Sequence, residues 1–150
     1  MDNNKQAEWD MYFLSLAREI SKKSKDPSTK VGSVITKNNR IIATGYNGLP
    51  KGIKDSQERL NNRDDKLLTV IHGEMNALLH SNEDLTNCTI YVFPFAPCSN
   101  CTSAIIQKGI KRVVHQKASP ELLDRWKRSL ELSYEFLDEA KVERVELEIK

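Results

Sequence analysis

The stretch that decides the fold runs from residue 88 to residue 115 and reads CTIYVFPFAPCSNCTSAIIQKGIKRVVH. Its two ends are short apolar runs of the kind that form buried strands, and the segment between them has a helical pattern. Ser99 can serve as an N-cap and Gly109 as a C′ stop, so we predict a helix over residues 99–108. A strand, a helix and a second strand in this order predict a parallel crossover unit.

The chain before this unit predicts two further elements of the fold. Apolar residues recur at helical spacing over residues 9–20, which predicts an opening amphipathic helix. Residues 31–45, VGSVITKNNRIIATG, read as a hairpin that turns at Asn38-Asn39. Residues 46–66 read as a long polar loop, and long loops in compact domains often carry function. A short helix is expected over residues 72–80.

The chain after this unit predicts a last helix and an edge strand. The helix starts at Ser119-Pro120, and the alternating end, VELEIK, reads as the strand over residues 145–150. The apolar stripe of the helix comprises Leu123, Trp126, Leu130, Tyr134 and Leu137. Together these elements predict a three-layer α/β/α sandwich with a mixed central sheet, in which the first two strands are antiparallel.

Composition limits the classes of protein to consider. The 150 residues fit one domain, residues 1–150, and 39% hydrophobic with 29% charged residues is ordinary for a globular protein. A net charge of +2 and 7% aromatics give no argument for a nucleic-acid partner, and no apolar run approaches a membrane span. The polar opening MDNNKQAEWD is unlike a signal peptide, and three cysteines make no disulfide framework. We therefore expect a cytoplasmic protein with reduced thiols.

Cys98 and Cys101 have a spacing that zinc fingers, redox dithiols and catalytic metal sites all use. Two cysteines cannot complete a tetrahedral zinc site, so a further ligand is needed. The strongest candidate is His72, which also lies at the start of an expected helix. The other candidates are Cys88, His80 and His115.

The sequence His72-x-Glu74, followed after 22 residues by Pro97-Cys98-x-x-Cys101, is far more specific than either half. This combination is the signature of zinc-dependent nucleobase deaminases. Three protein ligands leave a fourth position of the zinc open for water, as in catalytic sites. Glu74 would reach that water without binding the metal and would act as the general base and acid. We therefore expect one catalytic Zn²⁺ per chain.

The segments HGEMNAL, PCSNC and IIQKGIKRVV resemble the cytidine deaminase superfamily. Within it, FLSLAREISKKSKDPSTKVGSVI and IIATGYNGLPKG are similar to the deoxycytidylate (dCMP) deaminase family, and the likeness covers most of residues 9–115. The resemblance implies hydrolytic deamination of dCMP to dUMP and ammonia in pyrimidine deoxynucleotide biosynthesis. It also implies a homo-oligomer, a hexamer or a dimer.

The resemblance also implies several residues that bind the substrate. Asn47 would contact the sugar or the base, and Ser24 and Lys25 would contact the 5′-phosphate. Gly73 and Pro97, which belong to the two zinc motifs, would complete the substrate site. The chain departs from the family at Gly73, where alanine is usual.

Regulation is a further implication of the resemblance. In the family dCTP activates and dTTP inhibits, so Tyr46 and Gly48 of the GYNGLP segment are candidates for an effector site that binds nucleoside triphosphates with Mg²⁺. After residue 115 the chain reads QKASPELLDRW and lacks the tyrosine-containing segment expected beside the substrate phosphate.

Three alternatives to a dCMP deaminase are open. The first is a deaminase of dCTP, cytidine or a riboflavin precursor. The second is an editor of tRNA or single-stranded DNA, which would need a basic surface and stacking aromatics that this composition does not favour. The third is a zinc-stabilised interaction module without catalysis, for which Glu74 would have no use.

Overall fold

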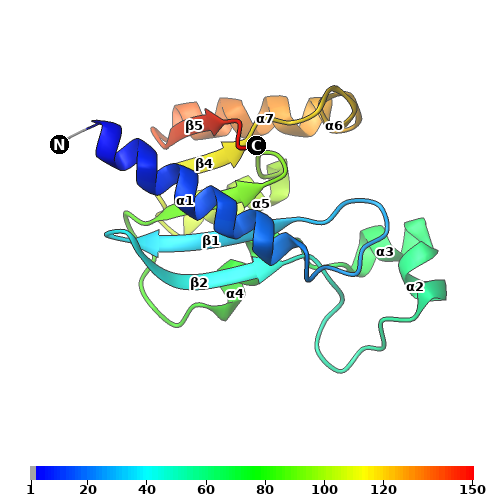
Figure 1. Ribbon diagram of the computed structural model, residues 1–150. Coiled ribbons are helices and arrows are strands. Elements are labelled where there is room, and N and C mark those ends of the chain that lie inside the picture. Colours follow the sequence, from blue (N-terminus) through cyan, green and yellow to red (C-terminus); the bar gives the residue numbers. More distant parts are fainter. Residues whose placement is uncertain (1–2) are drawn as a thin grey trace.

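A mixed five-stranded sheet forms the middle layer of the computed structural model, which describes residues 3–150 (Figure 1). Its strands are β1 (Gly32–Lys37), β2 (Arg40–Tyr46), β3 (Thr89–Phe93), β4 (Arg112–Gln116) and β5 (Glu143–Leu147), in the spatial order β2-β1-β3-β4-β5. β1 is antiparallel to both β2 and β3, and β3, β4 and β5 are parallel to one another. The predicted mixed sheet is confirmed.

Helices cover both faces of this sheet. They are α1 (Asn3–Ser21), α2 (Gln57–Asn61), α3 (Arg63–Thr69), α4 (Gly73–His80), α5 (Ser99–Gln107), α6 (Pro120–Arg125) and α7 (Lys127–Glu139). α1 crosses one face, in front of the strands in Figure 1, and α4, α5 and α7 pack against the other. This arrangement confirms the three-layer α/β/α class.

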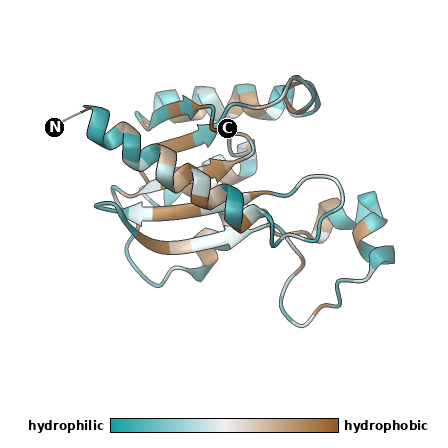
Figure 2. Ribbon diagram, viewed as in Figure 1, coloured by the Kyte–Doolittle hydropathy of each residue, from teal (hydrophilic) through white to brown (hydrophobic). Residues whose placement is uncertain are grey.

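The side chains of the strands alternate between the two layers, as their period of two requires. Val34, Tyr91 and Val114 are fully buried against α1. Ile35 and Ile90, their neighbours in sequence, are fully buried on the opposite side, in the cluster that α4, α5 and α7 complete. Much of the brown, apolar colour in Figure 2 lies in strands β1 to β4, whereas the surrounding helices alternate between teal and brown along their length.

The predicted hairpin turns where the sequence indicated. Asn38 and Asn39 have φ angles of 53° and 59°, and Lys37 pairs with Arg40. Two successive left-handed residues form the type I′ turn that suits the twist of two antiparallel strands, and asparagine tolerates this conformation well.

The prediction of a long loop over residues 46–66 was wrong, because this region contains α2 and the start of α3. Both helices begin at side-chain caps. The Ser56 hydroxyl accepts a hydrogen bond from the Arg59 amide, and the Asn62 side chain accepts one from the Asp65 amide. Helices this short have no apolar periodicity, so only their caps mark them in the sequence.

The last helix was predicted as continuous but is broken at Trp126, where φ is −107° and ψ is 14°. α6 ends at Arg125 and α7 starts at Lys127, so the two helices do not share one apolar stripe. The last strand is indeed at the edge of the sheet, but it runs from Glu143 to Leu147 and not over residues 145–150.

A buried ionic group fastens α1 to the sheet. Both Asp10 carboxylate oxygens accept hydrogen bonds from Arg112, at 2.8 and 2.6 Å, and one also accepts from the Tyr91 hydroxyl at 2.7 Å. Asp10 is only 3% exposed. α1, β3 and β4 are thereby joined at a point that the apolar pattern alone does not specify.

No helix within residues 3–150 has both the length and the apolar character needed to cross a bilayer.

Candidate active site

Two helix starts position the candidate metal ligands. His72 is the N-cap of α4 and Cys98 the N-cap of α5, both with extended backbone. Ser99 was predicted to cap α5 but is its first helical residue. The carbonyls of His72 and Cys98 accept the first helical hydrogen bonds, from Asn76 and Thr102, whereas their side chains cap nothing. The imidazole of His72 and the thiol of Cys98 are therefore free to bind one metal ion.

The structure brings together His72, Cys98 and Cys101. Nδ1 of His72 lies 3.3 Å from Sγ of Cys98 and 3.4 Å from Sγ of Cys101, and the three ligand atoms all lie within 4.8 Å of one another. In a tetrahedral zinc site with usual bond lengths, nitrogen and sulfur ligands are about 3.6 Å apart. Within residues 3–150 this is the only such group of three or more potential ligands, and its donor set fits zinc.

The loop that carries Cys98 is held by α5 and α7. The Pro97 carbonyl accepts hydrogen bonds from the Ser133 hydroxyl at 2.9 Å and from the Thr102 hydroxyl at 3.4 Å, and both donors are fully buried. The Ser99 amide donates to the Ser129 hydroxyl at 2.8 Å. Ser129 and Ser133 of α7 therefore position the segment that carries Cys98 and Cys101.

Close packing against β2 fixes the start of α4. A Cβ atom at Gly45 would lie 2.3 Å from the Ala77 amide nitrogen and 2.4 Å from the Gly73 carbonyl oxygen, so only glycine fits. The Ser33 hydroxyl donates to the same Gly73 carbonyl at 2.8 Å. A Cβ at Gly73 would lie 3.1 Å from Val31, so alanine at this position would require Val31 to shift slightly.

Glu74 lies beside this cluster at the bottom of a pocket and is only 4% exposed. Burial, together with the negative charge of the Cys98 thiolate, raises the pKa of Glu74 to about 7, although the charge of His72 acts in the opposite direction. A divalent cation on the neighbouring ligands would favour the carboxylate and lower this pKa again. With a cation bound, Glu74 would therefore be a carboxylate at neutral pH.

Cys98 is the thiol that ionises first. Hydrogen bonding from Cys101, aided by His72, lowers the pKa of Cys98 to about 4 against the opposing effect of burial. The same pairing with Cys98 and its own burial raise the pKa of Cys101. The hydrogen bond with Cys98 also raises the pKa of His72. A metal ion that needs two thiolates must therefore displace the proton that the two sulfurs share.

The pocket above Glu74 has an apolar wall and a polar rim. Phe95 and Trp126 form part of the wall, with ring centroids 5.8 Å apart, and the Trp126 ring lies edge-on to His72 at 6.5 Å. Arg63, Arg125 and Thr29 line the pocket from α3, α6 and the segment between α1 and β1. A pocket that combines an aromatic surface with cationic side chains suits a flat, anionic ligand.

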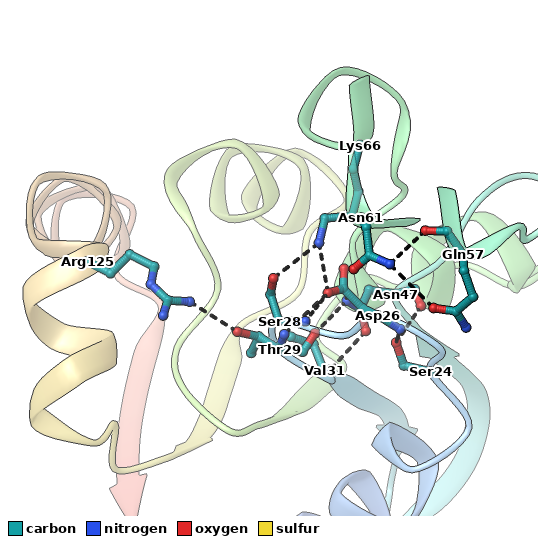
Figure 3. A network of polar contacts seen from close by, with 10 residues as sticks. All are labelled: Ser24, Asp26, Ser28, Thr29, Val31, Asn47, Gln57, Asn61, Lys66 and Arg125. Atoms are coloured by element: carbon teal, nitrogen blue, oxygen red, sulfur yellow. Dashed lines mark hydrogen bonds and ion pairs between the residues drawn. The ribbon is translucent and has the colours of Figure 1, made fainter. Parts of the chain in front are cut away.

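A network of polar contacts orders the segment between α1 and β1 (Figure 3). The Asp26 carboxylate accepts hydrogen bonds from the Ser28 amide at 2.8 Å and from Lys66 Nζ at 3.0 Å. The side chains of Asp26 and Lys66 are 8% and 7% exposed, so this ion pair is shielded from water. Asn47 completes the network, since its side chain accepts from the Val31 amide and donates to the Thr29 carbonyl, both at 2.9 Å.

The residues expected to bind substrate are not all at this pocket. Asn47 lines it, but Ser24 is buried behind it and donates its hydroxyl to the Asn47 carbonyl. The side chain of Lys25 is 69% exposed and lies 3.5 Å from Asp55. Gly73 and Pro97 do not line the pocket and support its ligands through their carbonyls.

Tyr46 and Gly48 lie together in a different place. Both line a second hollow, with Lys23 and Lys25 beside them, and Asn47 contributes to both cavities. Gly48 exchanges two backbone hydrogen bonds with Ile71, at 3.0 and 2.8 Å. The GYNGLP segment thus separates the hollow from the pocket.

Sequence reasoning missed Arg63, Lys66, Phe95 and Arg125 and assigned Trp126 to the core. None of them belongs to a metal motif. The sequence offered one signal for these residues. Arg125 and Trp126 are an arginine and a tryptophan side by side, shortly after the capped helix start at Ser119 and beyond the segment that resembles the family.

Three known proteins illustrate what this chain is similar to. It is 41% identical over 137 residues to a deaminase from the luxG 3′ region of Aliivibrio fischeri, covering 91% of this chain and 92% of the relative. It is 39% identical over 114 residues to the deoxycytidylate deaminase of Homo sapiens, covering 71% of this chain and 64% of that one. The crystal structure of dCMP deaminase from cyanophage S-TIM5 has the same fold, with a TM-score of 0.73 at 24% identity, over 98% of this chain and 100% of that one.

The family model described as the cytidine and deoxycytidylate deaminase zinc-binding region matches residues 7–117. This range contains the three converging ligands and Glu74. The chain therefore belongs to the cytidine and deoxycytidylate deaminase family.

Proposed function

We propose that this protein deaminates dCMP hydrolytically to dUMP and ammonia, using one zinc ion held by His72, Cys98 and Cys101. The observation that carries the proposal is the buried Glu74 carboxyl beside these converging ligands, at the bottom of a pocket with cations at its rim. A structural zinc site has no need of such a carboxyl or of an open pocket. The name of the human relative supports dCMP as the substrate, although this chain spans only 64% of that enzyme.

Zinc, when bound at these three ligands, would act as a Lewis acid and lower the pKa of water at its fourth position. The chain supplies the proton transfers. Glu74 takes one proton from the attacking water and passes it to ring N3, so that the hydroxide oxygen bonds to C4. It then carries the second proton from that oxygen to the exocyclic amine, the C4–N bond breaks, and ammonia leaves. A pKa raised by burial and lowered by the cation suits a group that must alternate between base and acid.

The pocket wall orients the base for this chemistry. Phe95 and Trp126 offer aromatic surface in the pocket that His72 and Glu74 also line, so a pyrimidine ring packed against this surface would lie next to the reacting groups. Apolar walls also keep bulk water from the reacting carbon.

Replacing Glu74 by glutamine tests the proposal. The zinc-loaded Glu74→Gln variant should retain its fold and metal but lose at least about 10²-fold in turnover, the low end for a positioned acid–base group. Glu83→Gln, on the exposed surface, is the matched control and should behave as the wild type. Ammonia release is measured from dCMP, dCTP, cytidine and an RNA hairpin. A preference for any substrate other than dCMP, or near-normal turnover of Glu74→Gln, would contradict the proposal.

The hollow at Tyr46 and Gly48 is the proposed effector site. Lys23 and Lys25 beside it would pair with the triphosphate of dCTP or dTTP, whose remaining charge Mg²⁺ would neutralise. Turnover of dCMP below saturation should therefore rise with dCTP–Mg²⁺ and fall with dTTP–Mg²⁺. Unchanged hyperbolic kinetics with both nucleotides would mean that the hollow has no regulatory role.

Self-association and cellular location complete the proposal. We expect a cytoplasmic homo-oligomer, a hexamer or a dimer, as the resemblance implies. Light scattering on the zinc-loaded protein gives its mass directly, and a monomer at micromolar concentration would contradict the oligomer.

A further inference from the structure

A nucleotide in this pocket needs a partner for its phosphate, and two nearby lysines are unsuitable. Lys25 points away from the pocket and faces Asp55. Lys66 lines the pocket, but its charge is neutralised by Asp26 in a pair that water barely reaches. Drawing Lys66 toward a phosphate would leave Asp26 as a buried, unpaired carboxylate, which is costly. Neither Lys25 nor Lys66 is therefore suited to the phosphate contact.

Arg125 is placed to make this contact. It is the last residue of α6, and its guanidinium extends from that helix to the opposite side of the pocket (Figure 3). There Nη1 donates to the Thr29 hydroxyl at 3.4 Å, a long and therefore weak hydrogen bond. Its other partner is Glu121 at 3.0 Å, whose side chain is 80% exposed, and such an exposed pair contributes little. A phosphate can replace either partner at small cost.

Trp126, the residue after Arg125, determines how a bound nucleotide would lie in the pocket. Trp126 breaks the helix and turns its ring onto the pocket wall beside Phe95 and His72. Its Nε1 is buried, and it has no hydrogen-bond partner within residues 3–150. A base against this wall, with its reacting carbon at Glu74, leaves its sugar and phosphate at the rim, where Arg125 lies.

Arg63, the first residue of α3, also lines this pocket and has no acidic partner within residues 3–150. We propose, on the basis of the proposed function, that Arg125 binds the 5′-phosphate of the substrate with Arg63 as a second contact, and so selects nucleotides over nucleosides. A guanidinium presents two parallel N–H donors to a phosphate, an arrangement that lysine cannot reproduce.

Substrate discrimination tests this assignment. Arg125→Gln should lower kcat/KM for dCMP about 10- to 100-fold, which is the range for one charge-assisted contact. Deoxycytidine, which lacks the phosphate, should be deaminated by Arg125→Gln and wild type within about threefold, and this activity also reports that the variant is folded. Arg128→Gln is the matched control, because Arg128 is 76% exposed on α7 and does not line the pocket. Arg63→Gln should produce a smaller loss for dCMP alone.

A binding measurement gives a second readout that does not depend on turnover. By calorimetry, Arg125→Gln should weaken binding of the product dUMP by a similar factor and leave deoxyuridine unchanged. An unaltered ratio of dCMP to deoxycytidine activity, with unaltered dUMP affinity, would overturn the phosphate assignment while leaving the proposed function intact. If the wild type deaminates dCMP no better than deoxycytidine, the proposed preference for dCMP and the role of Arg125 fall together.

Discussion

Replacing Asp10 by asparagine should destabilise the protein far more than a single surface charge would. The Asp10 carboxylate accepts four hydrogen bonds, two from Arg112, one from Tyr91 and one from Gln6, and is 3% exposed. Asparagine has only one oxygen, so its amide group must face a donor, and Arg112 loses its main counter-charge. Breaking a buried ion pair from one side costs about 3–5 kcal/mol, a large part of a typical stability of about 5–15 kcal/mol.

Chemical denaturation at pH 7 measures this cost, at fixed zinc and protein concentrations because binding and association shift the apparent stability. Glu143→Gln is the control, since Glu143 pairs with the same Arg112 but its side chain is 62% exposed, and it should cost below about 1 kcal/mol. A loss below about 1 kcal/mol in Asp10→Asn, or equal losses in the two variants, would refute the reasoning.

The pH dependence of stability gives an independent check on Asp10. Burial alone would raise its pKa, but hydrogen bonds from Arg112 and Tyr91 outweigh burial and hold the pKa below the usual 3.8. The unfolded chain therefore binds a proton more readily than the folded one at acid pH. The stabilisation should be complete above about pH 3.8 and be lost as the pH falls through the folded-state pKa, and Asp10→Asn should lack this acid-sensitive contribution.

Three further results are expected. Metal analysis should show that Cys98→Ala and Cys101→Ala each lose bound zinc. Cys88→Ala should retain zinc, because Cys88 is buried in the apolar core away from the ligands. Zinc retained by Cys98→Ala or Cys101→Ala would contradict the ligand set. Gly45→Ala should push α4 off β2 and weaken zinc retention against a chelator, and normal retention would show that the contact can relax. Burial lowers the pKa of His115 below 6.5, so stability should be full above that pH and decline as the pH falls toward the folded-state pKa, a decline that His115→Gln should flatten.

The sequence by itself determined the layers of the fold and the metal ligands. Alternation in the strands requires helices on both faces, and the Asn38-Asn39 pair predicts its turn through local backbone preference. His72, Cys98 and Cys101 were identifiable because each lies at the start of a helix with a motif spacing that this chemistry requires. The hairpin turn and each of the two zinc motifs depend on residues that are near one another in the chain.

The substrate side of the pocket was decided by tertiary structure. Arg125 meets Thr29 across 96 positions of sequence, and Ser133 holds the Pro97 carbonyl across 36. The apolar spacing of Trp126 favoured a continuous helix with a core tryptophan. The ring does pack against a buried apolar cluster, but the helix is broken there and the ring also lines the pocket. Lys25 carries the right charge for a phosphate, yet its position depends on how the segment before β1 folds against Asp26 and Lys66. Charge and hydrophobicity are properties of single residues, whereas the direction in which a side chain points depends on packing between distant segments, and only the folded chain contains that information.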